Sequence, residues 1–135
     1  MRRAAKGLKR LGISFDALLT SPLVRARQTS EIVADSLGLE SWLEEIPELA
    51  PDSSVERLIA SLNRFHDREN LLLVGHNPLI SHAFAFFATG KKESSLEIEL
   101  KKGGLCRIEV DGLPPASSGT LHWFLTPKQL RLLGD

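Results

Sequence analysis

The stretch TSPLVRARQT at residues 20–29 and the stretch LVGHNPL at residues 73–79 decide the fold of this chain. Each follows a short apolar run and has a proline near the start of a helical pattern, which predicts a strand turning directly into a helix. Two such junctions indicate an α/β fold. Ligand-binding groups lie at the carboxyl ends of strands in such folds, and both stretches carry side chains that suit a phosphate.

The composition fits a single domain over residues 1–135. The chain has 17 basic and 17 acidic residues, so its overall charge indicates no nucleic-acid partner. One cysteine, Cys106, excludes an internal disulfide framework and fits a reducing compartment. No apolar run is long enough to span a membrane, and residues 2–12 lack the apolar centre of a secretory signal. We therefore expect a cytoplasmic domain with no membrane partner.

Hydrophobic periodicity and capping residues predict the remaining elements. Helices are expected over residues 2–12, 22–37, 55–62 and 78–88, with a short one after Pro127. Strands are expected over residues 15–19, 71–74 and 121–125, with a weak one at 46–49 and a hairpin formed by 96–100 and 106–110. Helices and strands alternate first and strands follow one another later, which predicts an α/β sandwich with a mixed sheet.

Arg25 is the first candidate for an anion-binding residue. A cation in the first turn of a helix is disfavoured by roughly 0.3–1 kcal/mol, because the helix N-terminus is itself positive. Arg27 can pair with Glu31 four residues on, whereas Arg25 has no carboxylate at those offsets. A bound phosphate would satisfy both Arg25 and the helix N-terminus. The alternative is that Arg25 extends into solvent or pairs with a distant acid.

His76 is the second candidate, because it follows Gly75 at the carboxyl end of an apolar strand. The alternative is that it only bonds a loop carbonyl. The other three histidines are expected to be packing or surface residues, namely His66, His82 and His122. No pattern for a zinc site, a dinucleotide site or a P-loop is present, so we expect no metal and no cofactor.

At the level of motifs, residues 21–29 and 74–78 resemble the second and third motifs of the histidine phosphatase superfamily. The resemblance extends over most of the chain and is closest to the compact bacterial branch of SixA-like phosphohistidine phosphatases. It implies a phosphoglycerate-mutase-like, three-layer α/β sandwich with a mixed, mainly parallel sheet. It also implies that Arg25 clamps the phosphoryl group and that His76 hydrogen-bonds the same group, with Ser21 as a further phosphate-binding residue. Glu48 is a candidate general acid, the alternative being a surface residue.

One departure from the family is large. The family opens with a strand that ends in Arg-His-Gly, whose histidine is the nucleophile, and this tripeptide occurs nowhere in the sequence. Met1 falls where the first helix of the family is already under way. We therefore expect an N-terminally truncated form of a longer gene product that lacks the first strand and is inactive alone, with a genuine short paralogue as the lesser alternative.

Three functions follow from these observations. The first is a phosphohistidine phosphatase, a hydrolase that acts through a phosphohistidine intermediate. The second is a phosphate-binding or phosphoprotein-binding pseudoenzyme, and the third is an interaction module in which both motifs are only capped turns. The expected partner is a phosphohistidine-bearing protein or a small phosphorylated substrate. The sequence leaves the oligomeric state open.

Overall fold

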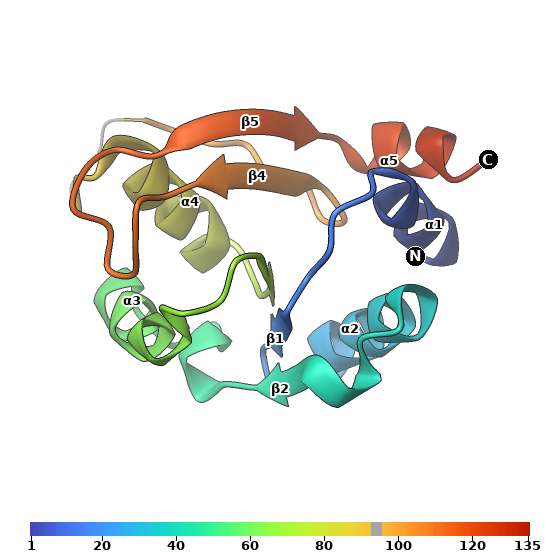
Figure 1. The fold of residues 1–135 in the computed structure, drawn as a ribbon, viewed down its shortest axis with the longest axis horizontal. Coiled ribbons are helices and arrows are strands. Elements are labelled where there is room, and N and C mark those ends of the chain that lie inside the picture. Colours follow the sequence, from blue (N-terminus) through green and yellow to red (C-terminus); the bar gives the residue numbers. More distant parts are fainter. Residues whose placement is uncertain (93–95) are drawn as a thin grey trace.

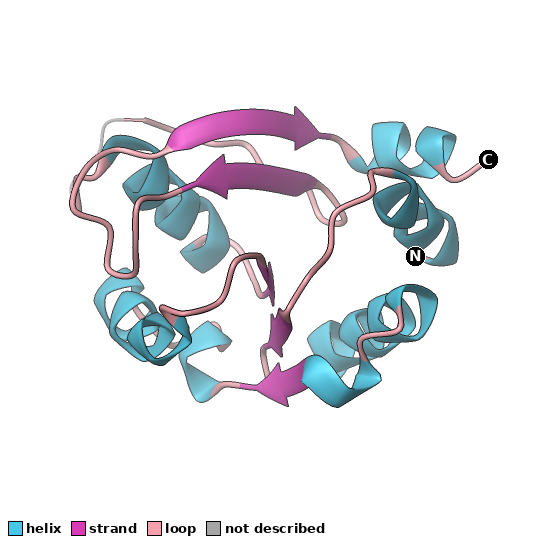
Figure 2. Ribbon diagram, viewed as in Figure 1, coloured by secondary structure: helices cyan, strands magenta, loops and turns pink. Residues whose placement is uncertain are grey.

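The computed structural model describes residues 1–92 and 96–135 as an α/β fold (Figures 1 and 2). Its α-helices are α1 (Arg2–Arg10), α2 (Val24–Leu37), α3 (Val55–Leu62), α4 (Leu79–Thr89) and α5 (Pro127–Leu133). Its strands are β1 (Ala17–Thr20), β2 (Leu43–Glu45), β3 (Leu71–Val74), β4 (Leu105–Glu109) and β5 (Thr120–Leu125). Short 3-10 helices are η1 (Glu40–Trp42), η2 (Pro47–Leu49) and η3 (Asn63–Phe65). Within these described ranges, no helix has the length and apolar character that crossing a bilayer requires.

The first sheet is parallel and has the order β2-β1-β3. β1 is its central strand, with Leu18 opposite Leu43 on one side and Leu72 on the other. All four residues of β1 are buried, as the apolar run predicts. β3 is only partly buried, although the same reasoning predicts burial on both faces. Among the described residues β3 pairs with β1 alone, so its other edge carries no described strand.

Helices cover both faces of this sheet and produce two apolar clusters. Leu19 points to a cluster filled by α3 and α4, which includes Leu58 and Phe86. Its neighbour Leu18 points to the opposite face, where α1 and α2 contribute Leu8 and Val33. Figure 1 shows α3 and α4 on one side of β1 and α1 and α2 on the other. The predicted three-layer arrangement is therefore confirmed.

The strands near the C-terminus differ from the prediction. β4 pairs antiparallel with β5, and the two form a separate two-stranded sheet. The predicted strand at 96–100 is wrong within its described residues, which adopt no regular structure. Leu100 is buried in the first cluster, and its carbonyl accepts a hydrogen bond from the side chain of Asn77. This hydrogen bond attaches residues 96–100 to the loop after β3 and not to β4.

One further strand was misplaced. The weak strand predicted at 46–49 is wrong: the strand is β2, and residues 47–49 form η2. Ile46 still donates its N–H to the carbonyl of Thr20, but Pro47 has no N–H with which to extend the ladder. The starts of α3 and α5 agree with the prediction: Ser54 caps α3, and α5 begins with a capping box at Thr126.

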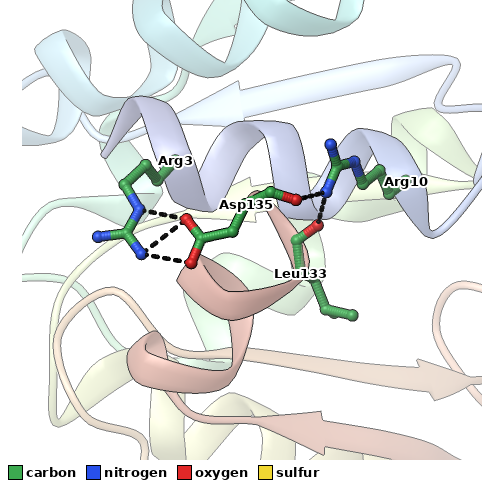
Figure 3. A network of polar contacts seen from close by, with 4 residues as sticks. All are labelled: Arg3, Arg10, Leu133 and Asp135. Carbon is green, nitrogen blue, oxygen red and sulfur yellow. Dashed lines mark hydrogen bonds and ion pairs between the residues drawn. The ribbon is translucent and has the colours of Figure 1, made fainter.

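Helices α1 and α5 bring the two ends of the chain together (Figure 3). Arg3 binds the carboxylate of Asp135 through two hydrogen bonds of 2.9 and 2.8 Å. Arg10 donates to the backbone carbonyls of Leu133 and Asp135. Gly7 lies at the crossing, where a Cβ would stand 2.1 Å from the carbonyl oxygen of Leu130. The helices therefore approach with their backbones in contact.

Candidate functional site

The two motif stretches meet at the carboxyl edge of the parallel sheet. β1 and β3 are adjacent, and the ladder between them continues past the last strand residues, because Ser21 donates its N–H to the carbonyl of Val74 at 2.9 Å. His76 follows Gly75, and its ring points back toward the end of β1. Its Nε2 lies 2.8 Å from the Oγ of Ser21. The structure thus joins two predicted site residues that are 55 positions apart in the sequence.

Ser21 is held inside the protein. It is 0% exposed, and its Oγ accepts a second hydrogen bond from the N–H of Leu23 at 3.2 Å. The helix predicted to begin at residue 22 begins only at Val24, with Leu23 as its N-cap. The phosphate contact of Ser21 stays a prediction.

The loop that carries His76 is fixed on both sides. A Cβ at Gly75 would stand 2.8 Å from the side chain of Ile80 and 3.3 Å from that of Leu49, so a side chain would not fit there. Pro78, and not Asn77, is the N-cap of α4. The amide of Asn77 instead donates to the carbonyl of Leu100 and accepts from the hydroxyl of Ser81. These contacts hold His76 half-buried at the sheet edge.

Arg25 and Arg27 have different surroundings, as their spacing predicts. Arg27 pairs with Glu31 at 3.7 Å and also with Glu45 of β2 at 2.7 Å, a contact that local spacing gives no means of predicting. Arg25 is exposed in the first turn of α2, and no described residue bonds its guanidinium. α2 has no acidic residue in its first turn. Arg25 is therefore available for an anion at the N-terminus of α2.

Glu48 lies at the same edge of the sheet, one strand further out. It is half-buried on η2, which directly follows β2, and its neighbour Leu49 borders Gly75. No described residue forms a hydrogen bond or an ion pair with Glu48. The structure therefore places Glu48 near the His76 loop without joining it to either His76 or Arg25.

A cavity of about 410 Å³ opens beside the His76 loop, and the sequence reasoning did not find it. It lies between the N-terminal turns of α3 and α4. Its polar lining includes Ser53, Glu56, His82 and Lys92, while Pro78 connects it to the loop. These residues come from three separate segments, so no single motif marks them.

The three other histidines and Cys106 lie outside the site formed by Ser21 and His76. His66 and His82 are exposed, and His122 is exposed on β5, where it contacts Glu109 at 2.8 Å. Cys106 is buried, and this burial raises the pKa of its thiol to about 11. Over the described part of the chain, no group of acidic, histidine and cysteine side chains is arranged to hold a metal ion.

Comparisons with known proteins show what this chain is similar to. The model of the histidine phosphatase superfamily (branch 1) matches residues 1–50. An uncharacterized protein of Picosynechococcus sp. is 39% identical over 106 residues, which cover 75% of this chain and 61% of that relative. The chain thus spans less than two thirds of that relative's length. Phosphohistidine phosphatase SixA of Escherichia coli K12 is 28% identical over 133 residues, which cover 97% of this chain and 78% of SixA.

A solved structure extends the similarity to three dimensions. The protein histidine phosphatase SixA complexed with tungstate superposes with a TM-score of 0.81 and 28% identity, covering 96% of this chain and 80% of that chain. The family model, the sequence relatives and the solved structure therefore agree: the chain is similar to proteins of the histidine phosphatase superfamily, SixA phosphohistidine phosphatase among them.

Proposed function

We propose that this chain binds the phosphoryl group of a phosphohistidine-bearing protein, with Arg25 and His76 as the binding residues. The observation that carries the proposal is the Ser21–His76 contact of 2.8 Å, which brings the second junction against the first. Arg25 contributes a guanidinium with no bonded partner among the described residues. A guanidinium, an imidazole and a helix N-terminus are the groups that stabilise a phosphoryl group during its transfer.

Within the family, this site would serve hydrolysis of phosphohistidine. The phosphoryl group would pass from the substrate imidazole to a nucleophilic histidine, so that the substrate P–N bond breaks as a new P–N bond forms. Attack by water would then break this second bond and release inorganic phosphate. The relative SixA is named a phosphohistidine phosphatase, which supports this substrate class. Glu48 is our candidate for the residue that donates a proton to the leaving group.

The sequence contains no Arg-His-Gly tripeptide, and this favours binding without turnover as the second candidate function. We propose that residues 1–135 alone bind the phosphoryl group and do not hydrolyse it. The test is release of inorganic phosphate from a phosphohistidine peptide. We expect no release above that of His76→Ala. Turnover that His76→Ala abolishes would contradict the proposal and would make His76 the nucleophile.

Oxyanion binding tests the site itself. Calorimetric titration with tungstate or inorganic phosphate should show one site, and Arg25→Ala should weaken it by roughly 10- to 100-fold. This range corresponds to the loss of one charge-assisted hydrogen bond of about 1.5–3 kcal/mol.

Arg27→Ala is the matched control. It removes the same charge from the same helix, but Arg27 is already paired with Glu45, so affinity should change by less than about threefold. Equal losses in both variants would indicate that only overall charge matters. Absence of binding to the unmodified chain would favour the third function, an interaction module without a phosphate site.

A further inference from the structure

We infer that Ser21 is a positioning residue that fixes the tautomer of His76, so that the neutral imidazole carries its proton on Nδ1 and presents that N–H to the ligand. This inference rests on the proposed function, because it states how His76 meets the phosphoryl group. It differs from the direct phosphate contact predicted for Ser21 from the sequence.

The argument starts from the hydroxyl hydrogen of Ser21. A serine hydroxyl has one hydrogen to donate and two lone pairs to accept with. Ser21 is 0% exposed, so water does not reach it, and a buried donor left without an acceptor is costly. The hydrogen therefore needs an acceptor inside the protein.

Two groups lie within hydrogen-bond distance of the Oγ in the described structure. The N–H of Leu23, at 3.2 Å, is a donor and occupies one lone pair of the oxygen. The other group is Nε2 of His76 at 2.8 Å. Only Nε2 can accept, and it does so only when it carries no hydrogen. Ser21 therefore donates to Nε2, and the ring hydrogen is on Nδ1.

The opposite tautomer leaves Ser21 unsatisfied. With hydrogen on Nε2, the ring would donate to Oγ and fill its second lone pair, and the serine hydrogen would have no acceptor. Nδ1, in contrast, has no bonded partner among the described residues, and His76 is half-buried at the sheet edge. The favoured tautomer thus offers a free N–H donor at the place where an oxyanion would bind.

The test is the 15N spectrum of the four histidine rings in the ligand-free chain, recorded at a pH well above the ordinary titration range of imidazole. His76 is assigned by comparison with His76→Gln. We expect a pyrrole-like signal for Nδ1 and a pyridine-like signal for Nε2 of His76. The reverse pattern in the unmodified chain would overturn the inference without any variant having to fold.

Variants of Ser21 supply the second arm. Ser21→Ala should shift His76 toward the Nε2–H form, while Ser21→Cys, which keeps a small donor, should retain more of the Nδ1–H form. An unchanged ring spectrum in folded Ser21→Ala would also overturn the inference. Folding of both variants is checked by circular dichroism.

Tungstate titration separates this inference from the proposed function. Ser21→Ala should weaken tungstate binding by roughly tenfold, as expected when one charge-assisted donor is lost from the site. If the unmodified chain shows the expected tautomer but binds no tungstate, the proposed function fails and the role of Ser21 stands. If tungstate binds and the tautomer is the reverse, the role of Ser21 fails and the proposed function stands.

Discussion

We expect the thiol of Cys106 to react slowly in the folded chain, because burial raises its pKa to about 11. At pH 8 a thiol of this pKa is thiolate in roughly one molecule in a thousand, against about a quarter for an ordinary cysteine. We expect less than a tenth of the chain to react with a thiol reagent such as DTNB on a timescale that modifies free cysteine completely. Addition of guanidinium chloride should expose the thiol and give one equivalent of product. Rapid reaction without denaturant would contradict the burial of Cys106.

Asp16 connects the starts of β1 and β3 and makes stability depend on pH. Partial burial raises the pKa of its carboxyl, but the hydrogen bonds from the N–H groups of Glu69 and Asn70, both 2.9 Å, together outweigh burial and lower the pKa. The ionised form is therefore favoured by folding. Its stabilisation is present above the unfolded pKa of about 3.9 and is lost as pH falls through the lower folded pKa.

Asp16→Asn tests this dependence by urea unfolding at pH 7 and near pH 2. We expect the free energy of unfolding of the variant to be about 1 kcal/mol lower than that of the parent at pH 7, because one backbone N–H then faces an amide donor. Near pH 2 the two free energies of unfolding should be equal. Asp67→Asn is the control, because the side chain of Asp67 is 71% exposed. An equal loss of unfolding free energy at both pH values would indicate that Asp16→Asn acts through the shape of the side chain and not through its charge.

At the scale of elements, the crossing of α1 and α5 depends on Gly7. Alanine is the better helix former by about 1 kcal/mol, but its Cβ would stand 2.1 Å from the backbone of Leu130 and force the helices apart. We expect Gly7→Ala to lower the free energy of unfolding by about 2 kcal/mol, within the range for overpacked sites. Lys6→Ala, on the exposed side of α1, should change it by less than about 0.5 kcal/mol. Stabilisation by Gly7→Ala would mean that α1 and α5 do not cross there.

The sequence predicted elements well where the signal is local. The periodicity of α3, the proline at the start of α5 and the apolar runs of β1 and β3 place these elements within a few residues. The failures have non-local causes. β2 is a strand because it pairs with Leu18 and its neighbours in β1. Residues 96–100 are held by a hydrogen bond from Asn77 and do not pair with β4.

The same distinction holds for the site. The spacing of charged residues predicts that Arg25 has no local partner, and in the structure no described residue bonds its guanidinium. The bond between Ser21 and His76 spans 55 positions and depends on the adjacency of β1 and β3, which no local pattern contains. The ion pair of Arg27 with Glu45 has the same origin, because β2 lies beside β1.

The whole molecule is a three-stranded parallel sheet between two helical layers, with a second small sheet whose residues contact both apolar clusters. Members of the second sheet, including Ile108 and Phe124, pack against the cluster under α4. The candidate site lies at the carboxyl edge of the parallel sheet, away from the α1–α5 crossing that joins the chain ends. Changes to that crossing should therefore affect stability more than oxyanion binding.

β3 has a consequence for handling the protein. Its sequence is Leu-Leu-Leu-Val, it is only partly buried, and one of its edges has no described strand beside it. Backbone donors and acceptors along an apolar edge of this kind form a template on which a strand from another molecule can add. We therefore expect self-association to rise with protein concentration, and a lysine introduced into β3 to reduce it while weakening the packing of the core.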